Sequence, residues 1–424
     1  MKISNIYFKN IFFISLVGII IYSLLFHKFY YSHYDFIYYE YEWKNFQNNY
    51  NSYITYFKNF VIKNKNYLSR PLSPIIYTFS TYYLSFSPKF FYFITIIITI
   101  IISCIVSYVL SIILQNNLIG FLIGLFYLLN PTKLLITIHL MNFHILNSGL
   151  FFVFSILFFL KSIENNSKIL LLISLIFYAI SINFAEVGVF YFVIYIILVQ
   201  KLKQKINDKK FILFFLIIIL LFIFAIFWKL FLYEKIIGIN YYKKIDFHFS
   251  YLFKHTIELI IQFFNFHFFK FFWFDYIIRG IIYLKNFAIY KIILIIISSI
   301  IIYIGLNSNI TNENIERVNL KLIIYFLILG LFGIIIFIPS TYGIYDYHSH
   351  INVLISIFTS SCNVLIILFI LKIINRKFKL PNYFIKLILT FFIVILIPIV
   401  LFRIELNNRK KIKMFYLSQI IVTF

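Results

Sequence analysis

Long apolar runs separated by short polar connections form the dominant pattern of this chain. Runs close to the roughly 20 apolar residues that a helix needs to cross a bilayer recur from residue 11 to residue 402. The clearest lie at residues 90–114, 211–232 and 351–373. A helix satisfies its own backbone polar groups in lipid, and no barrel-like alternation is visible. The pattern therefore predicts an all-α integral membrane protein with about 11 to 13 transmembrane helices.

The runs follow one another without an internal repeat or a linker, which predicts a single polytopic membrane domain over residues 1–424. A short basic tail follows at residues 403–424. The remaining runs lie at residues 11–26, 71–87, 118–129, 150–160, 169–182, 187–199, 289–306, 322–339 and 387–402.

Basic connections predict the orientation, because lysine and arginine are enriched in cytoplasmic loops. Residues 201–210, KLKQKINDKK, are the strongest cytoplasmic marker, and Lys2 and Lys9 place the N-terminus on the same side. Counting every run would put residues 201–210 outside. One run is therefore predicted to be re-entrant or a double span, and residues 118–149 are the candidate region.

Three polar segments interrupt the apolar pattern. Residues 27–72 are predicted to be the first extracytoplasmic loop and to form part of an active site at the membrane surface. Residues 233–286 mix charged residues with dense phenylalanine and are predicted to form amphipathic helices at the interface, with one or two short spans as the alternative. Residues 339–350 form a second polar cluster between two strong runs.

Composition excludes a soluble protein, because only 12% of the residues are charged, against about 25% in soluble domains. The formal net charge of +24 would favour nucleic acid in a soluble protein. Here the lysines stand in short connections, where they set topology and meet anionic headgroups. We therefore expect membrane lipids, and no nucleic acid, as partners. Cys104 and Cys362 fall inside apolar runs, so no disulfide framework or Cys-based metal site is predicted.

The first loop carries the strongest candidates for chemistry. Asp35 stands just beyond the first run, where a carboxylate can take a proton from an acceptor hydroxyl or hold a metal near a phosphate. The alternative is a solvated loop acid. Glu40 and Glu42 would fall on different helix faces, and Glu40 is retained as a supporting residue. Arg70, in R-P-L, can hold phosphate oxygens bidentately, or else extend to lipid headgroups.

Glu186, in NFAEVGVF, is flanked by apolar residues. At membrane depth an ionisable residue is usually functional, whereas at the surface it would be an ordinary interfacial acid. His139 and His144 can pair with it or with a phosphate. The alternative for each histidine is a hydrogen-bonded packing residue.

The second polar cluster, PSTYGIYDYHSH, offers Asp346, His348 and His350 as ligands for a divalent cation. No further ligand is identified, so the metal and any other cofactor stay unknown. Contact with a sugar or a lipid phosphate is favoured instead, with His348 on the donor phosphate and Tyr345 in support.

The order of these features resembles the GT-C class of polytopic glycosyltransferases, especially the branch similar to protein O-mannosyltransferases. The resemblance rests on the acid after the first run, the R-P-L at residues 70–72, the N-P at residues 130–131 and the A-E junction at Glu186. Members usually show K-E at that junction and two adjacent acids in the first loop. Here Asp35 is followed by Phe36, and no arginine follows Pro339 in the later cluster. These departures concern the metal and the identity of the sugar.

The resemblance implies a membrane glycosyltransferase with amphipathic surface helices in its first loop, a catalytic Asp35 and a phosphate contact at Arg70. It would transfer a sugar from a polyprenyl-phosphate carrier to an envelope glycan, lipid or protein, on the extracytoplasmic face of the cytoplasmic membrane. An O-antigen-type polymerase or ligase is the first alternative, although Arg279 is the only arginine in the long later loop. A transporter or flippase of lipid-linked sugars is the second, although no paired halves are visible.

Overall fold

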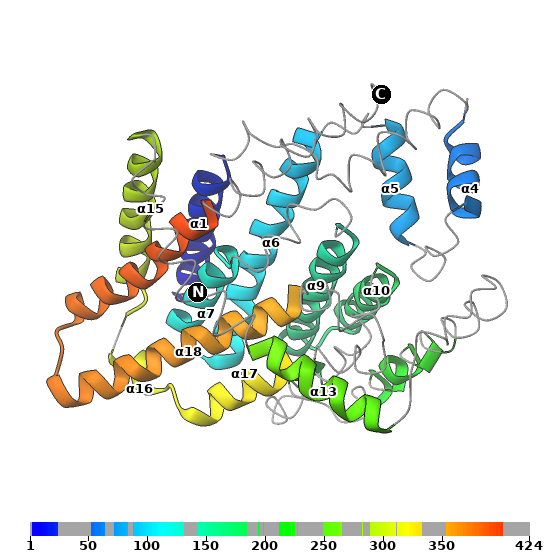
Figure 1. Cartoon of the computed structure of the whole chain (residues 1–424). Helices are drawn as coiled ribbons and strands as arrows, with labels where there is room; N and C mark the ends of the chain where they lie inside the picture. The colour runs from blue at the N-terminus through cyan, green and yellow to red at the C-terminus, as the bar shows by residue number, and fades with distance from the viewer. Residues whose placement is uncertain are drawn as a thin grey trace.

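The computed structural model describes residues 2–23, 52–63, 72–83, 88–130, 143–184, 249–264, 289–310, 312–332 and 353–401, with residues 194–195, 198, 212–214, 216–221, 223–224, 227 and 282. Every regular element in these residues is a helix (Figure 1). Within them, five helices are long and apolar enough to cross a membrane: Tyr92–Leu114, Phe143–Asn165, Ile289–Asn307, Ile355–Phe378 and Asn382–Leu401. The prediction of an α-helical chain with apolar helices of spanning length is therefore confirmed for the described residues. The predicted total of about 11 to 13 spans also depends on other residues and stays a prediction.

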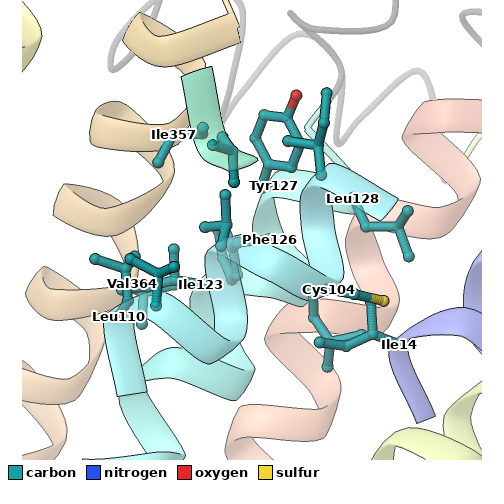
Figure 2. Close-up of a cluster of buried hydrophobic side chains, with 14 of the residues drawn as sticks. Ile14, Cys104, Leu110, Ile123, Phe126, Tyr127, Leu128, Ile357 and Val364 are labelled. Carbon is teal, nitrogen blue, oxygen red and sulfur yellow. The ribbon is translucent and has the colours of Figure 1, made fainter. Parts of the chain in front are cut away.

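A short buried helix, α7, occupies the centre of the described fold, and all its residues from Leu118 onward are buried. Figure 2 shows Ile123 of α7 beside Leu110 and Val364 of its neighbours. The bounds are α7 (Asn117–Leu128), α1 (Lys2–Ser23), α6 (Pro88–Leu114) and α18 (Val353–Phe378). The 12 residues of α7 rise about 18 Å, well short of the roughly 30 Å hydrocarbon layer. The helix alone cannot cross that layer, as the short run at residues 118–129 predicts.

Small residues let α6 and α7 approach each other closely. Ser103, Ser107 and Ser111 recur every four residues on α6, and Gly120 and Gly124 do so on α7. A Cβ atom on Gly120 would overlap Ser111 Oγ and lie 2.5 Å from the carbonyl oxygen of Ser107. One on Gly124 would lie 2.8 Å from Ser107 Cβ. Helices in lipid associate through such close packing, because lipid tails are as apolar as the side chains that face them.

Two pairs of serines join α9 (Phe143–Asn165) to α10 (Lys168–Phe184) in an antiparallel hairpin. Ser148 Oγ donates to the carbonyl oxygen of Ser181 at 3.0 Å, and Ser181 Oγ donates to that of Ser148 at 2.8 Å. Ser155 and Ser174 repeat this reciprocal arrangement seven residues further along. Seven residues are close to two helical turns, so the serines lie along one seam and fix the register of the hairpin.

Helix α9 begins at Phe143, whereas hydropathy predicts a span from residue 150. The predicted boundary is wrong, because the polar residues of this stretch find partners inside the bundle. Asn147 Nδ2 donates to the carbonyl oxygen of Phe143 at 2.9 Å, and Ser148 bonds across to α10. Polar side chains therefore extend the helix here instead of ending it.

The C-terminal half packs around the same centre, with α17 along α18 and α15 on α1. The elements are α15 (Ile289–Asn307), α16 (Asn312–Glu316), α17 (Leu320–Phe332) and a last helix, Asn382–Leu401. The runs that predict them at residues 289–306, 322–339, 351–373 and 387–402 are confirmed where they are described. Most isoleucines in the first half of α15 are exposed, as expected of a lipid-facing surface.

Helix α13 (Phe249–Phe264) has three different faces. Leu259 and Phe263 are buried against α17 and α18, Phe253 belongs to an exposed apolar face, and Lys254 belongs to a polar one. A helix that meets protein, lipid and water in this way suits the membrane interface. The prediction of amphipathic helices within residues 233–286 is confirmed for this segment.

Helix connections meet at one end of the molecule and form a mainly basic surface, here named the basic end. Arg317 Nη1 donates to the carbonyl oxygen of Gln115 at 2.9 Å, and Asn116 Nδ2 donates to that of Asn314 at 2.7 Å. These bonds join the α6–α7 turn to the connection between α15 and α17. The basic residues at this end are Lys9, Lys161, Lys168, Arg317, Lys321, Lys372, Arg376, Lys377, Lys379 and Lys386. The acidic residues in the same connections are Glu164, Glu313 and Glu316.

Glu316 links α16 to the end of α18 through ion pairs with two basic residues. Its Oε2 accepts a hydrogen bond from Arg376 Nη2 at 2.5 Å, and Lys372 Nζ lies 3.6 Å from the same oxygen. Lys372 Nζ also donates to the carbonyl oxygen of Val318 at 2.7 Å. The hydrogen bond from Arg376, aided by the charges of both bases, lowers the pKa of the Glu316 carboxyl.

We expect acid to weaken the ion pairs of Glu316 with Arg376 and Lys372. Because the folded-state pKa of Glu316 is lowered, its stabilising contribution is present above the unfolded-state pKa and is lost as pH falls through the folded-state value. The midpoint of thermal unfolding in detergent should therefore fall more steeply with acid in the wild type than in Glu316→Gln, over the window below about pH 4.5. Equal slopes for the two proteins would contradict this assignment.

Candidate functional site

The structure describes one of the predicted site residues, His144. The others lie outside the described residues: Asp35, Glu40, Arg70, His139, Glu186, Tyr345, Asp346, His348 and His350. The candidate site is therefore built from His144 and from the helix ends that lead into these other positions.

His144 lies in the first turn of α9 and is 9% exposed. Its Nδ1 is 3.0 Å from the hydroxyl oxygen of Tyr77, a buried residue of α5 (Leu72–Tyr83). Either the hydroxyl donates to a bare Nδ1 or a protonated Nδ1 donates to the hydroxyl, depending on the tautomer. The pair fixes the position of the imidazole and ties α5 to α9.

A second bond ties the start of α5 to the end of α10. Ser73 Oγ donates to the carbonyl oxygen of Phe184 at 3.1 Å, and both residues are buried. Ser73 precedes Tyr77 by one helical turn, so α5 uses the same face to hold α9 and α10. This polar stripe on α5 is absent from the residues that the sequence singles out. Two polar residues four apart near the start of an apolar helix are the signal that would have revealed it.

A third contact brings α18 to the same place. A Cβ atom on Gly149 of α9 would overlap the side chain of Val353, the first residue of α18, and lie 2.6 Å from Val353 Cβ. Gly149 is therefore needed for α18 to begin directly against α9. It follows His144 by little more than one helical turn.

Through these three contacts the ends of α5, α9, α10 and α18 pack together. Each end is followed or preceded in the sequence by a segment that contains a predicted site residue. Arg70 precedes Ser73 by three residues, and Glu186 follows Phe184 by two. His139 precedes His144 by five residues, and His350 precedes Val353 by three. Positions that are far apart in the sequence thus adjoin a single group of packed helix ends.

Neutral polar groups line the described part of this site. Helix α5 contains no charged residue, and α9, α10 and α18 contain none before Lys161, after Lys168 and before Lys372, respectively. Hydroxyls and an imidazole can position hydroxyl groups or phosphate oxygens, but any carboxylate must come from the adjoining stretches. No group of His, Cys, Asp and Glu in the described part of the chain could hold a metal ion.

An aromatic cluster covers the outer side of α5. Tyr53 of α4 (Tyr53–Lys63) lies with its ring centroid 5.7 Å from that of Tyr82 and 5.5 Å from that of Tyr83. Its hydroxyl oxygen is also 3.1 Å from Thr78 Oγ1. These contacts hold α4 beside α5, as Figure 1 shows at the upper right. The stretch predicted to be the first loop therefore contains a helix, and that helix flanks the candidate site. Its exposed side is mixed, with Ile54 and Ile62 on either side of Lys58, so the predicted amphipathic surface helices stay a prediction.

Removing the Tyr77 hydroxyl should loosen this group of helices. Tyr77→Phe keeps the ring but deletes the bond to His144, and the loss of a buried hydrogen bond costs about 1–2 kcal/mol. The measurement is the free energy of unfolding in detergent. Tyr53→Phe is the matched control and should lose less, because the Tyr53 hydroxyl bonds at a partly exposed position. An equal loss in both variants would show that the buried pair has no special role.

The site thus consists of a fixed imidazole, buried hydroxyls and four helix ends that lie close in sequence to Arg70, His139, Glu186 and His350. It lies away from the basic end, since α9 carries His144 in its first turn and the basic Lys161 in its last turns. The chain matches no family model, no curated protein and no solved structure.

Proposed function

We propose that this protein is a membrane glycosyltransferase that transfers a sugar from a polyprenyl-phosphate carrier to an envelope glycan, lipid or protein. The observation that carries the proposal is the meeting of α5, α9, α10 and α18 through Ser73, Tyr77 and Gly149. Two of the positions that resemble glycosyltransferase motifs, Arg70 and Glu186, are sequence neighbours of these helix ends.

Sugar transfer needs a base for the acceptor and cations for the leaving group. In the proposed reaction the acceptor hydroxyl oxygen attacks the anomeric carbon, and the bond from that carbon to the carrier phosphate breaks. Asp35 takes the hydroxyl proton, and the polyprenyl phosphate leaves with the bonding electrons. Arg70 and His348 hold the donor phosphate, since a guanidinium and an imidazole both donate hydrogen bonds to phosphate oxygens.

The remaining predicted residues act in support. We assign to His144 the orientation of a polar group of donor or acceptor, and its hydrogen bond with Tyr77, which fixes the imidazole, supports this role. The other supporting residues are Glu40, His139, Glu186, Tyr345, Asp346 and His350. The cofactor stays unknown, and Asp346, His348 and His350 are the candidate ligands of a divalent cation.

The charge distribution supports an orientation for the proposed site. Lysine and arginine favour the cytoplasmic side of membrane proteins, so we assign the basic end to the cytoplasm. The helix ends around His144 then face the extracytoplasmic side. A lipid carrier suits this arrangement, because its tail stays in the bilayer while its phosphate reaches the surface loops.

The test is sugar transfer by the purified protein in liposomes, with a panel of radiolabelled polyprenyl-phosphate sugars and a crude envelope extract as acceptor. We expect one donor to be consumed and its label to appear in the acceptor fraction. Liposomes without protein provide the background. If no donor is consumed while a labelled lipid crosses the bilayer, the protein is a flippase and the proposal fails.

Cysteine labelling checks the orientation independently. The two native cysteines, Cys104 and Cys362, are buried, so single cysteines can be introduced into the native background. Substitutions beside Asp35 and Asp346 should both react with a membrane-impermeant maleimide from outside. Reaction from opposite sides would separate the two halves of the proposed site.

A further inference from the structure

The turn between α18 and the last helix presents exposed bases and aromatic rings together. We name residues 376–386 the hairpin tip. Its exposed aromatic residues are Phe378, Tyr383 and Phe384, which are 64%, 60% and 45% exposed, respectively. Lys377 and Lys379 are exposed beside them. Aromatic and basic side chains together are typical of the headgroup region of a bilayer.

The depth of the tip follows from the helices on either side. Both neighbours, Ile355–Phe378 and Asn382–Leu401, are long and apolar enough to span a membrane, and only three residues separate them. The first has 24 residues and rises about 36 Å, which exceeds the roughly 30 Å hydrocarbon layer. The tip therefore reaches the headgroup layer when these helices cross the membrane.

Among the described residues, the positive charge of the tip is only partly balanced. From residue 372 to residue 401 the sequence has no Asp or Glu. Glu316 engages Arg376 and Lys372, and Lys386 donates to Asn307 Oδ1. Lys377 lies 5.5 Å from the ring centroid of Phe378, a contact that leaves its charge unneutralised.

The backbone of the tip keeps Lys379 in place. Lys379 has φ of 47°, a left-handed conformation, and its N–H donates to the carbonyl oxygen of Asn375 at 2.8 Å. Pro381 then starts the next turn, so the reversal is short and well defined. A base at this position is held at the outermost point between the two helices.

We propose that the hairpin tip binds the phosphate of an anionic phospholipid, with Lys377 and Lys379 as the charged contacts and Tyr383 and Phe384 beside the glycerol region. Charge complementarity favours this occupant, since unbalanced bases in the headgroup layer attract anionic lipids. The proposal does not depend on the proposed enzymatic activity, because the tip belongs to the basic end.

The test is a lipid titration of the full-length protein in detergent, followed by native mass spectrometry. Phosphatidylglycerol is the probe, phosphatidylcholine with the same acyl chains tests the charge, and glycerol phosphate tests the free headgroup. Each surface base contributes about fivefold to such binding, so Lys377→Gln combined with Lys379→Asn should weaken phosphatidylglycerol binding by about thirtyfold. Asparagine is chosen at position 379 because it tolerates the left-handed conformation.

Two matched variants and one condition complete the design. Lys58→Gln combined with Lys254→Gln removes the same charge from exposed positions on α4 and α13, and should change binding less than twofold. Lys377→Arg combined with Lys379→Arg should retain binding. High salt should weaken the wild-type complex, because mobile ions screen exposed charges, and this result does not depend on the folding of a variant. Unchanged binding by the neutral variant, equal binding of phosphatidylcholine, or full displacement by glycerol phosphate would each overturn the proposal.

Discussion

Gly120→Ala is expected to destabilise the protein by about 3 kcal/mol, the upper part of the range for overpacked cores. The new methyl group would overlap Ser111 Oγ and lie 2.5 Å from the carbonyl oxygen of Ser107. A hydroxyl can rotate away, but a carbonyl oxygen in the middle of α6 cannot move without moving the helix. The change therefore separates α6 from α7 inside the buried core, despite the better helix propensity of alanine.

The measurement is the free energy of unfolding in a mixed detergent titration. Gly330→Ala is the matched control, because there the nearest atom to the new methyl is the tip of the Phe263 ring, at 3.2 Å. A side-chain tip can shift by a few tenths of an ångström, so this variant should change stability by less than about 1 kcal/mol. Equal stability of the two variants would show that the α6–α7 contact is looser than described.

Asp35→Asn is expected to reduce sugar transfer by a factor of about 10² to 10⁴, the usual contribution of a general base. Asparagine keeps the size and hydrogen-bonding capacity of the side chain but cannot accept the proton of the acceptor hydroxyl. Donor binding should survive, because the phosphate contacts are assigned to Arg70 and His348. Arg70→Ala should instead weaken donor binding, so the two variants separate the chemical step from recognition of the carrier.

The assay compares turnover and donor affinity for both variants with the wild type. Glu164→Gln is the control, since this carboxylate forms an exposed ion pair with Lys161 at the basic end, at 2.7 Å. It should leave transfer unchanged. Full activity of Asp35→Asn would remove Asp35 from the mechanism, and the acids at Glu40 and Glu186 would then be tested in the same way.

Hydropathy alone predicts most of the described helices, because a helix that is buried in the bundle or crosses the hydrocarbon layer needs a continuous apolar run. The runs at residues 90–114 and 289–306 correspond to α6 and α15 within a few residues. The predicted start of α9 is wrong, and the reason for this error is informative. A single-sequence reading treats His144 and Asn147 as interruptions, whereas their partners lie on another helix and one turn back on the same helix.

The candidate site could be predicted only in part for the same reason. Motif order indicates Arg70 and Glu186 separately, but hydropathy does not say which helix ends meet. The bond between Ser73 and Phe184 joins residues that are 111 positions apart. Tyr77 was missed because a tyrosine in an apolar run reads as an interfacial or packing residue unless its partner is known.

The serine-paired hairpin and the central helix differ in when they can be completed during synthesis. Ser148 and Ser155 find their partners within 33 and 19 residues, so α9 and α10 can enter the bilayer as one closed unit soon after translation of α10. Helix α7 cannot do so, because the side chains of Asn116 and Asn130 bond to residues 198 and 230 positions later. The packing around α7 is therefore completed only after the C-terminal helices have been synthesised. In ribosome-bound intermediates, the α9–α10 hairpin should be inserted before α7 has its final neighbours.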